Sequence, residues 1–279
     1  MEGSEIKTRG EIINNERNEL QNLKNSNNVS NVNVNNDNDN NDIGYSWRHK
    51  FFAEFMGGIF LLFIGSGVGV YTQGDLVPIA LTNGTILGCL VYIFGPISGG
   101  HFNPSITVSE FLRKKLTLTE LIYYIIAQIV GGFIGSLLVA LCNRGKFGML
   151  ASNQIAQYLI KFNDKNNTKI DAWCYMCALI CEIVLTFFLI ILFIFLTTSK
   201  HNKNNNVNGI IVGASLSMFI FTGFHISGGS LNLMRSLPPA VLEAIFGNNS
   251  TAIKQIWIYI VGPIVGSVIA TYIAPCFLQ

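Results

Sequence analysis

Two asparagines are the side chains in this sequence whose types and spacing suggest chemistry. Asn103 lies in Ile-Ser-Gly-Gly-His-Phe-Asn-Pro-Ser (97–105), and Asn232 has the same place in Ile-Ser-Gly-Gly-Ser-Leu-Asn-Leu-Met (226–234). The segments lie 129 positions apart and share five identical residues in register. Each interrupts a long apolar stretch, and backbone freed inside a membrane must be buried in protein or face a water-filled cavity. Two matching interrupted segments in two halves of a chain indicate a transport site.

The chemistry open to these asparagines is hydrogen bonding. Without partners in hydrocarbon each side chain would cost several kcal/mol. At the tips of two facing short helices they can donate to passing molecules, while the positive helix ends repel cations and protons. The alternative is that both are plain helix caps. The sequence shows no nucleophile beside a base, no phosphate-binding glycine loop and no metal-ligand cluster, so we expect no catalytic residue, cofactor or metal.

An arginine and a histidine accompany the two segments. Arg235 follows Asn232 by three residues, and the equivalent position in the first copy holds Ile106. Arginine at membrane depth is rare and marks a functional site unless it snorkels to the interface. His101 either lines the path or is a structural histidine.

Two glutamates occupy equivalent positions in otherwise apolar runs. Glu54 and Glu182 lie 128 positions apart, close to the displacement of the asparagine segments. We expect both carboxylates to accept hydrogen bonds from the loose backbone N–H groups of those segments. A proton relay is the alternative.

The composition is that of an integral membrane protein. Half of the residues are hydrophobic and only 12% are charged, with a mean hydropathy of +0.42. A net charge of +2 and scattered basic residues give no support for a nucleic-acid partner. Six cysteines lie in or beside apolar runs, which favours packing over disulfides or metal binding.

The charge-free runs are long enough to cross a bilayer of about 30 Å. They predict an all-α membrane protein with six transmembrane helices and two re-entrant half-helices, which begin at Pro104 and Leu233 and are capped by the asparagines. Each half holds three spanning helices, an odd number, so the halves form an inverted repeat. The expected spanning helices begin near 51, 77, 119, 173, 207 and 255.

The predicted domains are a tail, 1–46, and a channel-like domain, 47–279, with repeats at about 51–142 and 173–277. The tail is asparagine-rich and should be disordered and cytoplasmic. Seven Lys and Arg residues on the side of the N-terminus against six opposite weakly favour cytoplasmic termini. Glycosylation sequons at Asn166 and Asn248 fall on the other side. The membrane would be the plasma membrane or that of an intracellular vesicle.

The motifs resemble those of the aquaporin, or major intrinsic protein, family. Ser-Gly-Gly-His-Phe-Asn-Pro-Ser-Ile-Thr (98–107) is similar to its first signature, and Ala127-Gln128 with Gly131-Gly132 to its third helix. Trp257 with Gly262-Pro263 is similar to its sixth. The likeness covers about 47–276. It implies tilted helices around a narrow pore that passes water or small neutral solutes in the lipid bilayer, usually as a homotetramer.

The resemblance also implies the pore centre and shows where this chain departs from the family. The paired Asn-Pro-Ala motif of the family reads Asn103-Pro104-Ser105 and Asn232-Leu233-Met234 here. Met234 is much larger than alanine, so we expect it to narrow the pore centre.

The outer filter of the family combines an arginine with three other residues. Arg235 matches the arginine, and by spacing Asn83, Ile220 and Gly229 occupy the other places. Water-selective members usually carry an aromatic residue and a histidine at two of them, so a wider filter is expected. Ser236 and Ala240 are instead similar to the water-channel pattern.

The function expected from the sequence is a passive channel, first for water and alternatively for urea, ammonia or glycerol. A coupled secondary transporter would need an ion site, for which Glu54 and Glu182 are the candidates. A gated or non-conducting structural relative is a third hypothesis, based on Met234.

Overall fold

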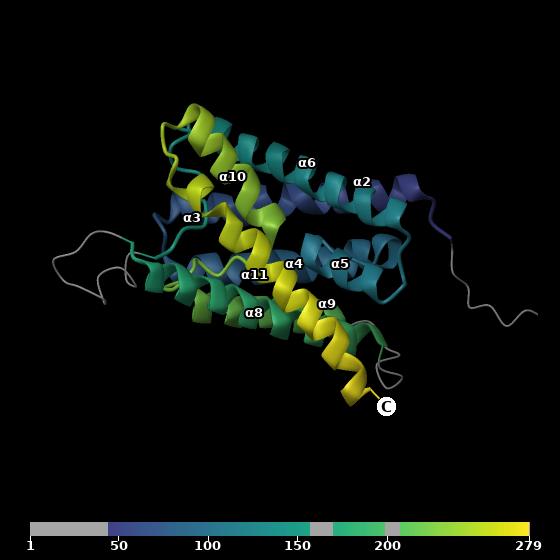
Figure 1. Cartoon of the computed structure of the whole chain (residues 1–279). Helices are drawn as coiled ribbons and strands as arrows, with labels where there is room; N and C mark the ends of the chain where they lie inside the picture. The colour runs from purple at the N-terminus through teal and green to yellow at the C-terminus, as the bar shows by residue number, and fades with distance from the viewer. Residues whose placement is uncertain (1–43, 157–169, 199–206, 279) are drawn as a thin grey trace, which may run out of the picture. The chain divides into compact units, whose positions relative to one another are not determined.

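The structure is a computed structural model that describes residues 44–156, 170–198 and 207–278 (Figure 1). The expected disorder of the tail falls almost wholly on residues 1–43, outside the described part. The sequon at Asn166 and the polar connection 200–206 also lie outside it.

The described residues form helices and connecting segments, with no strand among them. In repeat one these are α2 (Trp47–Phe60), a π-helical turn (Leu61–Ser66), α3 (Gly67–Tyr71), α4 (Leu76–Ser98), α5 (Pro104–Leu112) and α6 (Leu118–Cys142). In repeat two they are α8 (Ala172–Thr198), α9 (Asn208–Gly223), α10 (Leu233–Phe246), α11 (Thr251–Ile273) and a 3₁₀ turn (Ala274–Phe277).

The helices match the predicted all-α membrane architecture. Five continuous helical segments are long and apolar enough to cross a bilayer. The sixth, α9, has 16 residues, or about 24 Å at 1.5 Å per residue, and its start adjoins the undescribed connection. The last helix begins at Thr251, four residues before the expected Gln255, because polar residues and Lys254 are accommodated in its first turns.

The half-helices begin where the sequence predicts. Asn103 Oδ1 accepts a hydrogen bond from Ser105 N at 2.9 Å, and Asn232 Oδ1 accepts one from Met234 N at 3.0 Å. Both asparagines have extended backbone, as N-caps do. The predicted caps of α5 and α10 are confirmed.

Glycines bring the spanning helices into close contact. A Cβ at Gly84 would lie 2.3 Å from the carbonyl oxygen of Gly213, and one at Gly88 would lie 2.7 Å from that of Gly209, so α4 and α9 touch backbone to backbone. The equivalent pairs α2 with α6 and α8 with α11 are as tight. A Cβ at Gly131 or Gly266 would meet a carbonyl of the neighbouring helix at 2.2 or 2.3 Å. Such contacts suit helix association in lipid.

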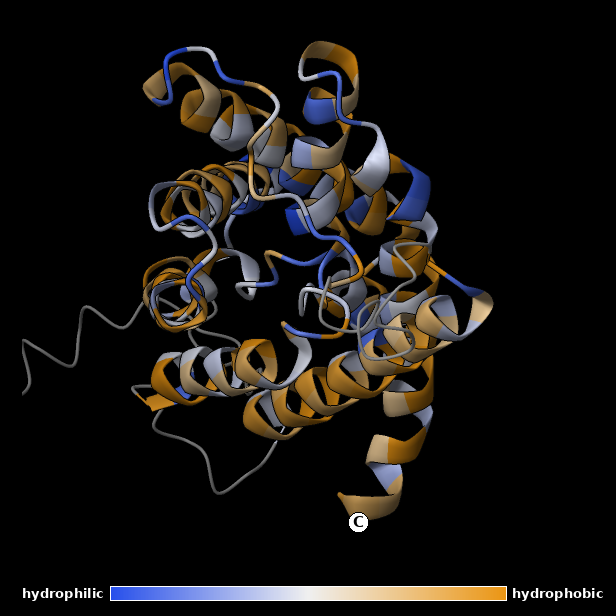
Figure 2. Ribbon diagram, turned by 90° about the vertical axis from the view of Figure 1, so that its left-hand side faces the viewer, coloured by the Kyte–Doolittle hydropathy of each residue, from blue (hydrophilic) through white to orange (hydrophobic). Residues whose placement is uncertain are grey.

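The outward faces of the helices are apolar. Figure 2 shows hydrophobic residues along most of the helical ribbon and hydrophilic ones concentrated in connecting segments. Large side chains such as Ile210, Trp173 and Tyr272 are more than half exposed. On a soluble protein such a surface would be a liability, whereas in a bilayer it is the surface that lipid covers.

Candidate functional site

The two half-helices meet tip to tip and are tied together by their capping asparagines. Asn103 Nδ2 donates to the carbonyl of Leu231 at 2.9 Å, and Asn232 Nδ2 donates to the carbonyl of Phe102 at 2.8 Å. Each asparagine therefore caps its own helix with its oxygen and binds the opposite segment with its nitrogen. Each NH₂ group has a second N–H, for which no protein partner is found among the described residues.

Glu54 holds the backbone of the first interrupted segment. Its Oε1 accepts from Ser98 Oγ at 2.7 Å and from His101 N at 3.0 Å, and its Oε2 accepts from Phe102 N at 2.7 Å. Gln128 Nε2 donates to the same Oε2 at 2.7 Å. The carboxylate is fully buried, so it supplies acceptors that water cannot.

Glu182 does the same for the second segment. It accepts from Ser227 Oγ at 2.7 Å, from Ser230 N at 2.9 Å and from Leu231 N at 2.7 Å. It is also fully buried. Both carboxylates thus receive the backbone N–H bonds expected from the sequence.

Two tyrosines add matching bonds that the sequence reading missed. Tyr124 OH donates to the carbonyl of Ser98, and Tyr259 OH donates to that of Ser227, each at 2.6 Å. Ser98 and Ser227 are equivalent residues of the two segments. Spacing alone did not reveal the tyrosines, because they lie on α6 and α11, where aromatic residues read as ordinary apolar positions.

A narrow cavity of about 30 Å³ runs past the asparagines. A water molecule needs roughly 10–15 Å³ of such space, so the cavity holds on the order of two. Twelve of its lining residues form six pairs related by the repeat: Leu61 with Leu189, Leu87 with Leu216, His101 with Ser230, Phe102 with Leu231, Asn103 with Asn232, and Ile106 with Arg235.

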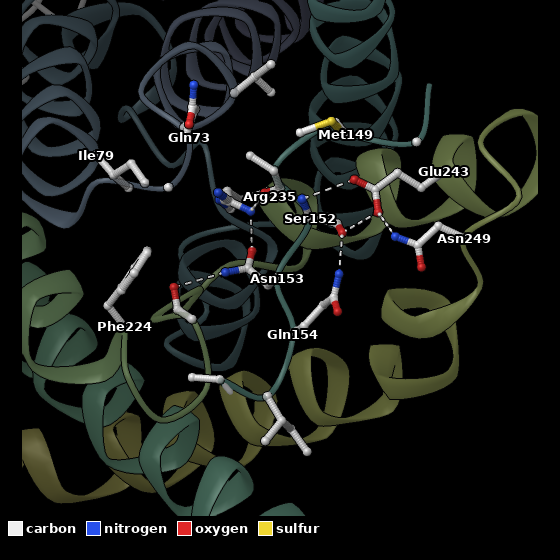
Figure 3. A pocket seen from close by; sticks show the side chains of 18 of the residues that line it. Gln73, Ile79, Met149, Ser152, Asn153, Gln154, Phe224, Arg235, Glu243 and Asn249 are labelled. Atoms are coloured by element: carbon white, nitrogen blue, oxygen red, sulfur yellow. Dashed lines mark hydrogen bonds between the residues drawn. The ribbon is translucent and has the colours of Figure 1, made fainter. Parts of the chain in front are cut away.

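The predicted filter residues converge at one end of this cavity. Asn83, Ile220, Gly229 and Arg235 come from α4, α9, the interrupted segment and α10, and all four line it. Arg235 also lines a vestibule of about 750 Å³, shown in Figure 3. The arginine therefore stands where the vestibule narrows into the cavity.

Arg235 is held by the polar segment 150–156, which the sequence reading treated only as a loop. Its Nη1 donates to the carbonyl of Ala151 at 2.8 Å and to Asn153 Oδ1. Asn153 Nδ2 donates to the carbonyl of Gly228 at 3.0 Å. Asn153 thus bridges Arg235 and the glycine turn that contains Gly229.

Glu243 in turn fixes this segment from α10. It accepts from Leu150 N at 2.8 Å and from Ser152 Oγ at 2.6 Å, as Figure 3 shows for Ser152. Gln255 Oε1 accepts from Ile155 N at 2.8 Å. An acidic residue inside the second half-helix was the available signal for Glu243, whereas nothing in the pattern identified Asn153.

The cavity reaches only part of the expected pore centre. Of its six predicted residues, Asn103 and Asn232 line the cavity, whereas Pro104, Ser105, Leu233 and Met234 do not. Met234 is fully buried in an apolar cluster with Phe102 and Leu62. Because α10 begins directly after its capping asparagine, the side chain two positions after the cap points into the packed interior. In this structure Met234 therefore does not line the cavity, and its narrowing of the pore centre stays a prediction.

Asn83 is less available to a solute than its polarity suggested. Its Nδ2 donates to the carbonyl of Gly65 at 3.2 Å and to that of Ile79 at 2.8 Å, which uses both of its N–H groups. Gly65 lies in the π-helical turn of the first span, a feature common at functional sites. The asparagine therefore ties α4 to that turn while it lines the cavity.

His101 fits both of its proposed roles. It lines the cavity, and its Nδ1 lies 3.2 Å from Thr107 Oγ1 in a buried setting. No group of His, Cys, Asp and Glu side chains suited to a metal ion occurs within the described ranges.

Comparison with known proteins gives one family. The family model described as "Major intrinsic protein" matches residues 44–274. "Glycerol uptake facilitator protein-like 6" of Lactiplantibacillus plantarum is 32% identical over 225 residues, covering 81% of this chain and 96% of the relative. Human "Aquaporin-5" is 30% identical over 223 residues, covering 78% and 77%. The X-ray structure of the aquaglyceroporin from Plasmodium falciparum matches with a TM-score of 0.64 at 20% identity, covering 82% of this chain and 95% of that one, which shows the fold alone.

The burial of Met234 predicts the effect of shortening it. Met234→Ala should lower the thermal unfolding temperature in detergent, since removing a buried Met side chain costs about 2–5 kcal/mol. Transport selectivity should stay the same. Met218→Ala is the control, because Met218 is 58% exposed on α9. Raised flux with undiminished stability would return Met234 to the pore wall.

The bonds of Asn153 predict a role in selectivity. Asn153→Leu keeps the size of the side chain but removes its acceptor for Arg235 and its donor to Gly228. Hydrogen bonds to charged groups contribute about 1.5–3 kcal/mol, so the urea-to-water permeability ratio should rise roughly tenfold. Proteoliposome swelling measures this ratio. Gln154→Leu, in the same vestibule wall, should leave it unchanged, and an unchanged ratio for Asn153→Leu would remove Asn153 from the filter.

Proposed function

The chain belongs to the major intrinsic protein family of membrane channels, and on that basis we propose that it conducts water passively in single file. Asn103 and Asn232 form the centre of the proposed pore, and Arg235 with Asn83, Ile220 and Gly229 forms its filter. Because the family consists of channels, a coupled transporter and an enzyme are set aside.

The observation that carries the proposal is the size of the cavity between filter and asparagines. Its volume of about 30 Å³ suits on the order of two water molecules. The second N–H of each asparagine is available to a water in the middle of the file. Apolar residues such as Leu61 and Leu189 form much of the remaining wall, so a water there has few competing partners.

The same arrangement supports exclusion of ions. Two helix N-termini point at the pore centre, and their partial positive charges repel cations and protons. The guanidinium of Arg235 adds a full positive charge at the entrance from the vestibule. A neutral water or solute meets neither barrier.

The second candidate cargo is a small neutral solute such as glycerol, urea or ammonia. Its support is a filter without an aromatic side chain and the likeness to a protein named as a glycerol uptake facilitator. Against glycerol stands the volume of the cavity, which suits only on the order of two water molecules.

We also propose an orientation, an assembly and a location for the channel. The slight excess of basic residues supports cytoplasmic termini, and the exposed sequon residue Asn248 borders the vestibule side of the fold. Membership in the family supports a homotetramer in the plasma membrane or a vesicle membrane.

Stopped-flow light scattering of proteoliposomes tests the proposal. Vesicles with the full chain should shrink faster than empty ones against an impermeant osmolyte, with a low activation energy, and should show less flux of urea and glycerol. Flux of glycerol equal to that of water would favour the second candidate. Shrinkage no faster than in empty liposomes, with folded protein inserted, would contradict both.

A further inference from the structure

The narrow cavity follows the repeat, but its two ends differ. Six of its residue pairs are related by the repeat, among them Leu87 with Leu216 and Ile106 with Arg235. Three further lining residues have no partner in the lining, and all three belong to the filter end: Asn83, Ile220 and Gly229.

The partners of these three residues lie at the far end, away from the vestibule. At the same displacement of 129 positions, Val212 corresponds to Asn83, Val91 to Ile220 and Gly100 to Gly229. The cavity does not reach any of these partners.

The correspondence holds in space as well as in sequence. A Cβ at Gly229 would lie 3.2 Å from Ile220 Cα, and one at Gly100 would lie 3.4 Å from Val91 Cα. The far end is therefore a second copy of the filter geometry, built from other side chains.

The faces of α4 and α9 that line the cavity continue toward these residues. On α4, Asn83, Leu87 and Val91 are four residues apart, so they share one face at steps of about 6 Å. The first two line the cavity, and Val91 lies one turn farther from the vestibule. On α9 the same spacing carries Ile220, Leu216 and Val212.

The far end is packed mainly with apolar side chains, although His101, the counterpart of Ser230, also lines the cavity. Val212 is 3% exposed and belongs to one cluster with Leu87, Phe102 and Val91. Ile106, the counterpart of Arg235, is 2% exposed. At the positions of the carboxamide of Asn83 and the guanidinium of Arg235, Val212 and Ile106 offer neither donor nor acceptor.

We infer that Val91, Val212 and Ile106 form a second constriction, which limits water flux by desolvation. This inference rests on the proposed water conduction. A water between these side chains gives up hydrogen bonds that they cannot replace, and apolar constrictions of this kind gate by dewetting. The two ends then have different roles. The end with Arg235 selects the permeating molecule by charge and size, and the apolar end limits the rate of water flux.

Substitution by threonine tests the inference, because threonine has the shape of valine with one methyl replaced by hydroxyl. Even when that hydroxyl donates to its own helix, its oxygen can accept a hydrogen bond from water. Val212→Thr and Val91→Thr should each raise water permeability about threefold if a lost hydrogen bond sets the barrier. Exclusion of urea and glycerol should be unchanged, since the filter is intact. Val184→Thr is the control and should have no effect, because Val184 lies on α8 and is 41% exposed.

The outcomes separate this inference from the proposed function. If Val212→Ala raises the flux and Val212→Thr does not, width and not wetting limits the rate, and desolvation is overturned. If the unmodified chain conducts water and all the variants match it, the inference fails while the proposed function stands. If neither the unmodified chain nor any inserted, folded variant conducts, both fail.

Discussion

The structure depends on hydrogen-bond partners for the backbone N–H groups of the two interrupted segments, which lie at membrane depth. Hydrocarbon offers no partner, and each orphaned group costs several kcal/mol. Glu54 and Glu182 supply that partner with two oxygens each, at His101 and Phe102 in one half and at Ser230 and Leu231 in the other. With the N–H groups bound there, the carbonyls of Phe102 and Leu231 are available to accept the bonds from Asn232 and Asn103. The contact between the two asparagine segments, our proposed pore centre, thus depends on the two carboxylates.

The two repeats share the residues that hold the scaffold, and the residues that differ between them account for the proposed selectivity. Glutamates, asparagines and serines recur in both halves with the same bonds. Arg235 has no charged counterpart, and it is held by Ala151 and Asn153 in a segment from the connection between the repeats. The vestibule end therefore carries a positioned charge that the far end lacks.

The repeat made most of the fold predictable. Helix positions, both caps and the acceptor role of the glutamates follow from apolar run length, cap chemistry and a constant displacement, all of which are local or periodic. Asn153 and Glu243 could not be identified in this way, because their partners lie far along the chain and loop conformation has no period. The orientation of Met234 could not be predicted, because a motif position does not say which way a side chain faces after a cap. The bonds of Asn83 depend on a π-helical turn that the apolar pattern does not signal.

Amide hydrogen exchange in a Glu182→Gln variant tests most directly whether the carboxylates hold the pore centre. The amide NH₂ group would face one of the N–H groups of Ser230 and Leu231, which leaves a buried donor unpaired at a cost of about 1–3 kcal/mol. Exchange over 226–232 should then accelerate by roughly tenfold or more and water permeability should fall, while exchange over 97–103, held by the intact Glu54, stays as in the unmodified chain. Equal exchange rates in both segments together with unchanged permeability would contradict the account.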